Sequence, residues 1–506
     1  MWPSWSRTEV EAGTAELAVN GWALGAFVGY LLLLMVIGVL SSRFSSAGIG
    51  EFFVGGRKMN RVVVALSAVV SGRSAWLLLG VTGMAFTIGF SAVWAVVGYT
   101  VAEMILFLSY AVRLRRFSEV RDCITVPDFF AARFGDADGA LRVTLSVVIL
   151  IFMVSYVSAQ LAGGGKAIGA SFGLSAQSGV LLTALVVLGY TMLGGFLAVS
   201  LTDTLQAGFM LIGLLVLPVV AIVDAGGWGP VAAEITLADA AVLDPCSLGA
   251  GALIGLVGIG LGSPGNPHIL VRYMSIADPR QLRFAAVVGT TWNVLMGAGA
   301  VLIGLVGRVY FTGVEALPAA DPENLYPTLA QAHLHPVLFG IVVASVFAAI
   351  MSTADSQLLV AASAVVRDVY ESVLKRGQEI PQARLVRMSR AVVFALVAVA
   401  LVLGVVAESL VFWLVLFAWA GLGAALGPTS ILALYWRRTT RAGVFAGLVT
   451  GTLTTIVWYL TPALKDRLYE LIPAFTLGLI ATVLVSAVTR PPEGVDEMFE
   501  AMGVGE

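Results

Sequence analysis

The chain has 506 residues, of which 59% are hydrophobic and only 12% are charged. A soluble globular domain is about 25% charged, so this chain lacks the polar residues for a water-facing surface. The net charge of −2 indicates no particular partner, and no basic tract points to nucleic acid. Apolar runs of about 20 residues recur, which is the length that spans a bilayer. Together these features predict a bundle of transmembrane helices and exclude a β-barrel, whose strands would be short and alternating.

Thirteen apolar spans follow one another along the chain. They cover residues 20–40, 62–89, 91–112, 141–170, 176–194, 197–223, 249–271, 285–310, 336–363, 391–407, 409–436, 442–461 and 472–489. Only the sequence GGF (194–196) separates the fifth span from the sixth. We therefore predict an all-α membrane protein with about 13 transmembrane helices.

Basic residues give the orientation of the spans. Of the 29 Lys and Arg residues, 23 lie in the loops that follow the odd-numbered spans, Arg272 after span seven among them. Loops rich in Lys and Arg stay on the cytoplasmic side, so we expect the N-terminus outside and the C-terminus in the cytoplasm. The N-terminal segment is polar and does not resemble a signal peptide. The tail 490–506 is short and acidic, and we expect it to be solvated.

Polar residues interrupt three of the spans. The interruptions are Ser71 to Ser74 in span two, Gly262 to Pro267 in span seven and Met351 to Gln357 in span nine. Broken helices in a membrane occur where the backbone lines a cavity or is packed in protein. Spans two and seven are five apart, so a five-helix unit repeated upside down would bring their breaks together at the bilayer midplane. Two breaks in register favour a transport site over chance Gly and Pro content.

Arg73 lies eleven residues into span two, about 16 Å deep at 1.5 Å per residue. An arginine at that depth costs about 2.5–3.5 kcal/mol on insertion scales, so it needs a partner or a water-filled cavity. Asp355 and Asp203 are the candidate partners. The pair is either structural or part of a site for an ion, proton or substrate. The histidines are too few for a transition-metal site, and we interpret His268 as structural.

Seven stretches of sequence carry a family resemblance. They are FFVGGRKMNRVVVALSA (52–68), SAWLL (74–78), TVPDFFAARF (125–134), LGGFLAVSLTDTLQAG (193–208), GNPHILVRYM (265–274), AAIMSTADSQLLV (348–360) and FAWAGLGAALGPTSILALYW (417–436). In these stretches the chain resembles the sodium:solute symporter family, and most closely its bacterial sodium/proline symporters. The resemblance implies a LeuT-type core of two inverted five-helix repeats, spans two to eleven, and alternating access.

The resemblance also implies site residues. The family's sodium site maps onto backbone oxygens near Val70 and Arg73 and onto Ala349, Ser352 and Thr353. Its second cation or proton path maps onto Asp203, and we add Asp355 and its neighbour Ser356. Positions near the family's substrate pocket map onto Ser74, Trp76, Tyr156, Ile259 and Ser263, with Arg73 beside them.

Departures from the family pattern leave two interpretations open. An acidic residue and a methionine of the family are Gly72 and Arg73 here, a pocket Trp and Tyr are Ile259 and Ser263, and a Ser is Asp355. In the first interpretation the Arg73 guanidinium replaces the bound sodium, and transport is sodium-independent or proton-linked. In the second interpretation the Arg73 guanidinium binds a substrate carboxylate through bidentate hydrogen bonds.

The function expected from the resemblance is secondary transport of proline or a related amino acid, coupled to Na⁺. The alternatives are a carrier for another carboxylate-bearing solute, driven by H⁺ or by no ion, and a membrane solute sensor. We expect no cofactor, no enzymatic activity and no obligatory protein partner, and place the chain in a bacterial inner membrane. We divide it into an N-terminal segment with the first helix (1–61), the transport core (62–436), two further helices (437–489) and the tail.

Overall fold

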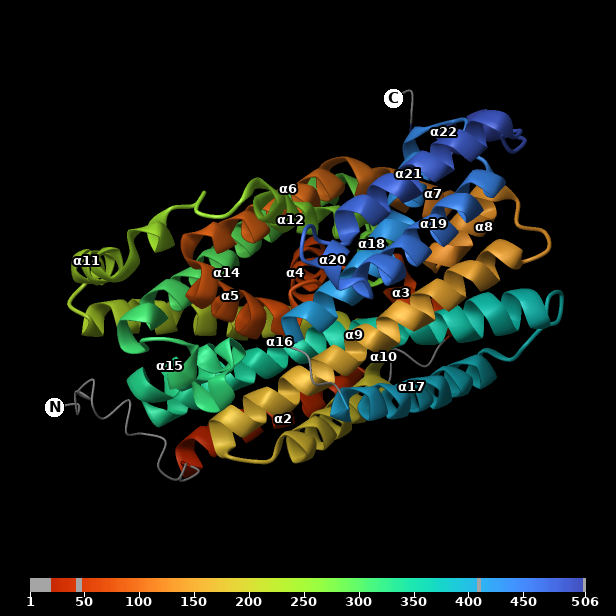
Figure 1. The fold of residues 1–506 in the computed structure, drawn as a ribbon. Helices are drawn as coiled ribbons and strands as arrows, with labels where there is room; N and C mark the ends of the chain where they lie inside the picture. Colours follow the sequence, from red (N-terminus) through yellow and green to blue (C-terminus); the bar gives the residue numbers. More distant parts are fainter. Residues whose placement is uncertain (1–19, 42–47, 407–410, 504–506) are drawn as a thin grey trace.

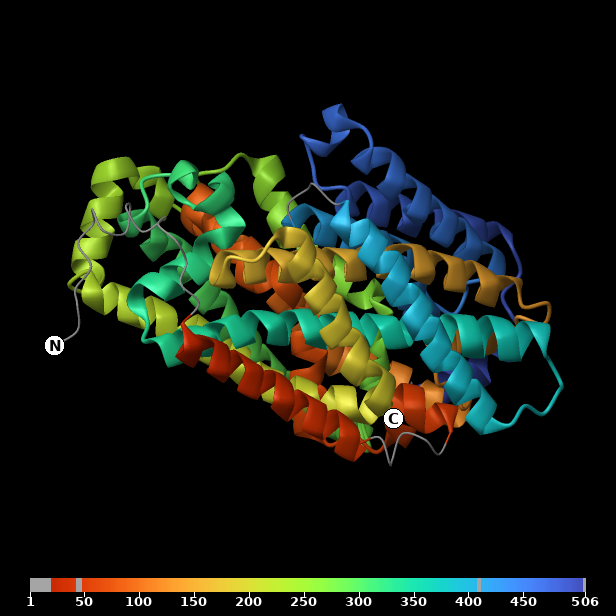
Figure 2. The ribbon, with the colours of Figure 1, turned by 90° about the horizontal axis from the view of Figure 1, so that it is seen from below.

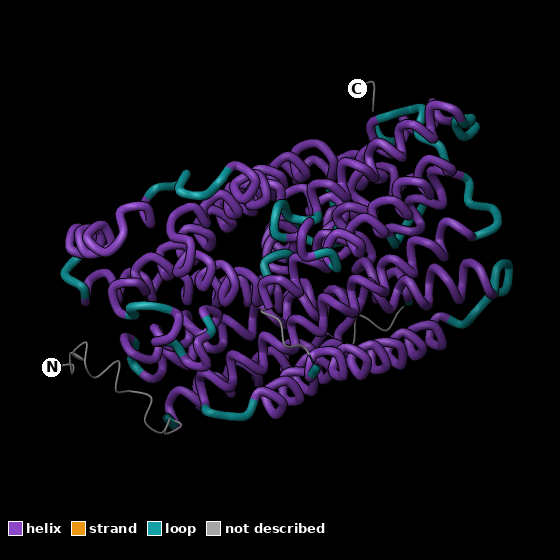
Figure 3. Tube along the Cα trace, viewed as in Figure 1, coloured by secondary structure: helices purple, strands orange, loops and turns teal. Residues whose placement is uncertain are grey.

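The computed structural model describes residues 20–41, 48–406 and 411–503, and within them it is helical, with one isolated β-bridge between Met59 and Ile276. Long helices lie side by side in a bundle (Figures 1 and 2), and the connections between them are mostly short (Figure 3). We name the two ends of the bundle after helices found there. The α8 face carries α8 (Val126–Phe134) and α22 (Val495–Ala501), and the α15 face carries α11 (Trp228–Asp239) and α15 (Leu325–His333).

Long and short helices make up the bundle. The long ones are α2 (Gly21–Ser41), α9 (Ala140–Phe172), α10 (Ala176–Asp224), α14 (Leu282–Tyr310), α16 (Pro336–Ser363), α17 (Gln382–Val405), α18 (Val411–Tyr435), α19 (Arg441–Tyr459) and α21 (Leu471–Val488). The shorter ones are α3 (Ile49–Val54), α4 (Arg61–Ser71), α5 (Thr82–Ile88), α6 (Val93–Ile105), α7 (Ala111–Val120), α12 (Ala250–Gly258), α13 (Pro267–Ser275) and α20 (Pro462–Lys465). Segments of 3-10 helix or π-helix connect or continue them: η1 (Gly55–Arg57), η2 (Trp76–Val81), η3 (Gly89–Ala92), η4 (Leu106–Tyr110), η5 (Ala240–Leu243), η6 (Ile259–Gly265), η7 (Pro279–Gln281), η8 (Val314–Ala316), η9 (Pro318–Ala320), η10 (Pro322–Asn324) and η11 (Ala364–Leu374).

Within the described residues, ten helical segments are long and apolar enough to cross a membrane, and three further apolar helices are shorter. The outer helices expose large apolar side chains, such as Leu32 and Leu40 of α2 and Leu484 of α21. In water such surfaces would drive association, whereas in a bilayer they contact lipid tails. The protein is therefore a multi-pass membrane protein. The count of thirteen spans and the orientation stay predictions, and the N-terminal segment lies outside the described residues.

A single glycine separates the fifth predicted span from the sixth. The segment α10 continues from Ala176 to Asp224 but contains Gly195 at φ 56° and ψ −162°. That combination is open almost only to glycine, which has no Cβ. The break falls inside the GGF sequence, as the sequence predicts.

Helix α16 lies at the centre of the bundle, against α2, α9, α10 and α4. Every residue from Val342 to Ser363 is buried. The polar run Met351 to Gln357 lies in this stretch, yet the helix continues through it, so our prediction of a break in span nine is wrong. The run has no Gly or Pro, and the Ser352 and Ser356 hydroxyls bond carbonyls of the preceding turn. Such bonds keep the polar groups satisfied without unwinding the helix.

The tail differs from the solvated segment we expected. Residues Val495–Ala501 form α22, with Met498 and Phe499 buried against the body of the protein. The Arg133 guanidinium of α8 contacts the Met498 sulfur and faces the Phe499 ring. An amphipathic helix has therefore docked on the α8 face, because its apolar side chains gain burial there.

Candidate functional site

The first broken helix opens between α4 and η2. Gly72 and Arg73 leave the helix, and Ser74 takes φ 52°, a left-handed conformation that is costly for a residue with a Cβ. The Ser74 hydroxyl accepts a hydrogen bond from the Trp76 amide at 3.1 Å, and the Ala75 amide donates to the Gln160 side chain of α9. The structure thus confirms this break, and side chains satisfy the Ala75 and Trp76 amides within it.

The second broken helix opens between η6 and α13. Asn266 is extended there, with φ −94° and ψ 102°, and its side-chain amide donates to the Gly262 carbonyl. Ser430 and Trp419 of α18 donate to the Pro264 and Ile259 carbonyls. The break in span seven is therefore present, and α18 supplies the hydrogen bonds that the interrupted helix cannot make.

Oxygen atoms from the first break and from α16 converge. The Ser352 hydroxyl lies 3.4 Å from the Val70 carbonyl and 3.1 Å from the Ala349 carbonyl, and the Thr353 hydroxyl lies 2.9 Å from the Ser71 carbonyl. Val70, Ala349, Ser352 and Thr353, which the family resemblance assigns to one cation site, are thus close together. The Arg73 carbonyl instead accepts a bond from the Leu77 amide.

The Arg73 side chain points away from this oxygen cluster. Its guanidinium forms an ion pair with Glu103 of α6, and the second Glu103 oxygen accepts from Asn293 of α14 at 2.8 Å. The Arg73 guanidinium also lies over the Tyr99 ring, 3.8 Å from its centroid. Our prediction that Asp355 or Asp203 is the partner is wrong. Helix α6 places Glu103 beside the break, and pairing the two charges avoids a buried uncompensated one.

Glu103 also accounts for a departure from the family pattern. A Cβ built on Gly72 would lie 3.7 Å from Glu103 Oε1. The family's acidic residue would begin at that Cβ, so here a carboxylate reaches the same place from α6. The signal for Glu103 was available in the sequence, because it is the acidic residue inside an otherwise apolar third span.

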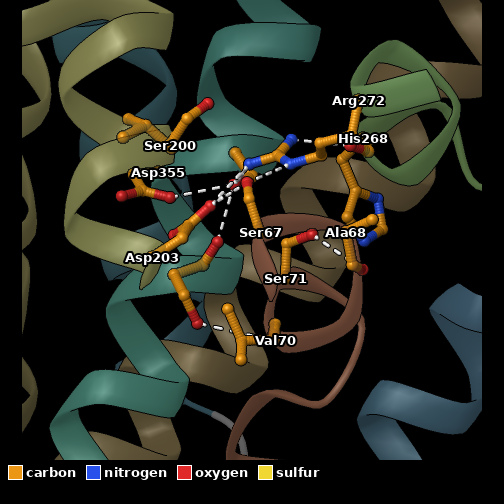
Figure 4. A network of polar contacts seen from close by, with 12 residues as sticks. Ser67, Ala68, Val70, Ser71, Ser200, Asp203, His268, Arg272 and Asp355 are labelled. Carbon is orange, nitrogen blue, oxygen red and sulfur yellow. Dashed lines mark hydrogen bonds and ion pairs between the residues drawn. The ribbon is translucent and has the colours of Figure 1, made fainter. Parts of the chain in front are cut away.

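Arg272 lies in the core and not in a cytoplasmic loop, contrary to our assignment. Its guanidinium pairs with Asp203 at 3.1 Å, donates to Ser67 at 3.0 Å and contacts the Ser356 hydroxyl. It also donates to the His268 carbonyl one turn earlier in α13 (Figure 4). Because α13 starts at the second break, a residue only six positions after Asn266 is still deep in the bundle.

Asp355 has its own partners on α10 and α16. The Tyr190 hydroxyl lies 2.5 Å from Asp355 Oδ2, and the Ser356 hydroxyl lies 3.0 Å from Oδ1. Asp203 accepts a 2.5 Å bond from Ser67 of α4. Asp203, Asp355 and Ser356, predicted as a second cation or proton path, therefore belong to one buried cluster around Arg272. The sequence interpretation missed Arg272 and Tyr190.

The predicted substrate residues surround the two breaks without forming one contiguous group. Trp76 packs against the rings of Tyr99 and Phe412, and Tyr156 packs edge-on against His268. Ser263 is buried. Among the described residues, several buried polar atoms here have no hydrogen-bond partner: Arg73 Nε, Trp76 Nε1, Tyr99 Oη, Ser263 Oγ and both His268 nitrogens. Such atoms are costly in a closed core, and a bound ligand or water would supply their missing partners.

A cavity of about 730 Å³ lies between the breaks and the α15 face. Ile259 and Phe412 line it, and Phe412 stacks on Trp76, so this ring stands between the cavity and the first break. The Glu323 carboxylate of η10 holds Phe412 in place by accepting from the Val411 and Phe412 amides at the start of α18. Lys166 pairs with the same carboxylate.

Ion pairs close the opposite end of the bundle. At the α8 face Arg142 bridges Asp128 and Asp368, Arg367 pairs with Asp128, and Thr125 donates to Asp368. Burial favours the neutral acid at Asp128, but the Arg367 and Arg142 guanidinium groups hold its pKa below the usual value. The large cavity thus lies towards the α15 face, and a network of ion pairs lies at the α8 face.

An all-helical bundle of apolar helices, in which two broken helices meet a polar central helix, defines a secondary transporter. A solved structure confirms this fold class: an outward-open Na⁺-coupled sialic acid symporter has a TM-score of 0.78 at 16% identity, covering 94% of this chain and 99% of its own. A nucleobase-cation-symport-1 family transporter in a closed conformation has a TM-score of 0.52 at 15% identity, covering 89% and 98%. The fold is thus of the LeuT type.

Sequence comparison gives the family. The model of the sodium:solute symporter family matches residues 52–451. The osmoregulated proline transporter OpuE of Bacillus subtilis is 36% identical over 467 residues, which are 92% of this chain and 94% of OpuE. A sodium/proline symporter of Staphylococcus aureus is 36% identical over 479 residues, 92% of each chain. The chain belongs to the sodium:solute symporter family, whose members are transporters and not enzymes.

Proposed function

We propose that this protein imports proline or a related amino acid together with Na⁺ across a bacterial plasma membrane. The observation that carries the proposal is the convergence of the Val70, Ala349, Ser352 and Thr353 oxygens at the first break. Neutral hydroxyl and carbonyl oxygens suit a hard monovalent cation, which must bind weakly enough to be released. The names of the bacterial relatives support proline as the solute.

The position of Arg73 argues against a guanidinium that replaces sodium. Glu103 offsets its charge, and the side chain is directed to α6 rather than to Ser352 and Thr353. The alternative of a sodium-independent carrier therefore loses its main support. The geometry supports the second interpretation, in which Arg73 contributes to substrate binding. Tyr99 contacts both Arg73 and Trp76, and each of the three has a buried donor without a partner among the described residues.

These three donors fit a carboxylate. A carboxylate accepts several hydrogen bonds, and charge-assisted bonds to a guanidinium are among the stronger ones in proteins. The Trp76 and Phe412 rings supply an apolar wall for the rest of a small side chain or ring. An amino acid combines both features, so it is the substrate class that the arrangement favours.

The direct test is uptake of labelled L-proline into proteoliposomes under an imposed Na⁺ gradient, an imposed H⁺ gradient, or neither. We expect uptake above the equilibrium level with the Na⁺ gradient. Equal uptake with and without Na⁺ would contradict sodium coupling. If no proline enters, other amino acids and carboxylates are tested in the same vesicles, and failure of all of them would contradict the proposal.

Removing one oxygen from the cation site is expected to weaken sodium binding. Ser352→Ala and Thr353→Ala should each raise the Na⁺ concentration for half-maximal uptake about tenfold, which corresponds to about 1.4 kcal/mol. The measurement is the Na⁺ dependence of uptake at fixed proline. Thr455→Ala is the matched control, because the Thr455 hydroxyl is buried but bonds only its own helix α19. An unchanged Na⁺ dependence in both site variants would place the cation elsewhere.

A further inference from the structure

The docked helix α22 lies outside the transport site described above. Its Met498 and Phe499 side chains and the following Met502 are buried against the body of the protein. The side chain of Arg133, fully buried in α8, contacts the Met498 sulfur and lies 5.4 Å from the centroid of the Phe499 ring. Arg437, which follows α18, lies 5.2 Å from the same centroid. Phe499 therefore links α8 to the end of α18.

Three segments of the bundle meet beneath α22. Besides α8 and the end of α18, α22 contacts α7 (Figure 1). Arg133 of α8 donates to the Ala433 carbonyl at 3.0 Å, and Arg113 of α7 donates to the neighbouring Leu434 carbonyl at 2.9 Å. Both carbonyls belong to the last turn of α18, where a helix has no amides of its own to pair with them. Helix α22 therefore covers a joint between α7, α8 and α18.

Helix α8 is fixed at two places. On one side Asp128 pairs with Arg142 of α9 and with Arg367 of η11. Five residues later in the same nine-residue helix, Arg133 is held by α22 and by α18. If α8 moves when the Asp128 ion pairs separate, the contacts of Arg133 with α22 must break or shift as well. The docked tail helix is therefore a second restraint on the same motion.

The docking of α22 is close to energetic balance. The helix has seven residues, and isolated helices of that length do not persist in water. Docking buries three large apolar side chains but costs the conformational entropy of the whole segment, and the two free energies are of similar size. The ion pair between Asp496 and Arg437 is exposed and adds little. A helix held in this way exchanges readily between a docked and a released state.

We propose that α22 is an autoinhibitory latch on the α8 face. In the docked state it holds α8 against α7 and α18 and slows the opening of this face. In the released state α8 is free of this restraint, and the Asp128 ion pairs hold the face closed. The effect on transport rests on the proposed function, whereas the effect on the accessibility of the α8 face does not.

Labelling of Cys123 tests the latch without any substrate. Cys123 is buried and lines a cavity at the α8 face, and a Cys246→Ser background makes it the single target. We expect maleimide to label Cys123 at least about fivefold faster in Phe499→Ser and in a chain that ends at Arg490, the low end of the coupling seen between two sites of a protein. Glu497→Gln changes an exposed residue of the same helix and should label at the wild-type rate. Unchanged labelling in both latch variants would overturn the proposal.

A second reporter separates a latch from a general loss of packing. Helix α19 starts at the α8 face, where Arg441 pairs with Asp138, and Thr455 is buried fourteen residues further along the same helix. Thr455→Cys, with both native cysteines replaced by serine, therefore reports on packing about 21 Å from that end. Release of α22 should leave the labelling rate at this position unchanged. Faster labelling of both reporters by the same factor would overturn the proposal, because the tail would then stabilise the fold as a whole.

Uptake by the same variants tests the inhibition. In proteoliposomes we expect Phe499→Ser and the shortened chain to take up labelled proline at least about twofold faster than the wild type, because the barrier to opening is lower. Glu497→Gln should match the wild type. Equal or slower uptake by both latch variants would overturn the inhibitory role. Absence of uptake in every variant and in the wild type would contradict the proposed function, and the Cys123 labelling rates would still decide whether α22 restrains the α8 face.

Discussion

Replacing Arg73 by methionine should lower the stability of the folded protein by about 3–5 kcal/mol, the range seen when one partner of a buried ion pair is removed. The substitution leaves the Glu103 carboxylate buried with Asn293 as its remaining partner. The double variant Arg73→Met with Glu103→Gln should recover most of the loss, because it leaves no unpaired charge. The measurement is thermal or denaturant unfolding of the purified protein in detergent, arranged as a double-mutant cycle.

Two further variants make the Arg73 result specific. Asp496→Asn breaks an exposed pair with Arg437 and should cost at most about 1 kcal/mol. Gly72→Asp in the Glu103→Gln background returns a carboxylate to the family's position, next to Arg73, and should restore stability lost by Glu103→Gln alone. Additive effects of Arg73→Met and Glu103→Gln would show that the two side chains are not coupled. That result would contradict the interpretation that the Glu103 carboxylate takes the place of the family's acidic residue at position 72.

Neutralising Asp128 should open the α8 face and expose Cys123 to thiol reagents. Cys123 is buried beside the Asp128 ion pairs, and burial raises the pKa of its thiol to about 12, so it is unreactive at neutral pH. In Asp128→Asn the Arg142 and Arg367 guanidinium groups lose their shared partner. We expect maleimide labelling of Cys123 to become at least about tenfold faster. A tenfold change in rate corresponds to a decrease of about 1.4 kcal/mol in the free energy of opening this face.

The chain suits this measurement because it has two cysteines, Cys123 and the exposed Cys246. A Cys246→Ser background makes Cys123 the single target, and Asp496→Asn, which removes an exposed pair with Arg437 on the same face, is the control. Because the pKa of Asp128 is lowered in the folded protein, its contribution is fully present at neutral pH and is lost as the pH falls through that value. Equal labelling rates in all variants would show that these ion pairs do not hold the face closed.

The two expectations have a common structural basis. The Arg73–Glu103 ion pair lies at the first break, and the Arg142–Asp368 ion pair lies at the α8 face. The cavity of about 730 Å³ lies towards the α15 face. Under the alternating access that the resemblance implies, we expect the pairs at the α8 face to separate while the Arg73–Glu103 pair, which joins the break after α4 to α6, persists or moves as a unit. Replacing Arg73 should therefore have the larger effect on the free energy of unfolding. Replacing Asp128 should have the larger effect on the accessibility of Cys123.

The sequence by itself determined the membrane class, the helical fold and the two helix breaks. These follow from local properties, because apolar length defines a span and Gly, Pro and Ser clusters mark where a helix can open. The family came from the resemblance of seven sequence stretches. Gly195 between two spans and Asn266 at the second break are examples that the structure confirms. The grouping of Val70, Ala349, Ser352 and Thr353 came from the resemblance, and the structure brings these residues together.

Only the tertiary structure decided which charges meet. Arg73 pairs with Glu103 rather than with Asp355, and Arg272 enters the core rather than a loop. The reason is that helices such as α16 are buried on all sides, so their sequence carries no alternation of apolar and polar faces that shows which face meets which neighbour. The partner of a buried charge depends on the rotation and depth of each packed helix, and these are set by contacts between segments far apart in the chain.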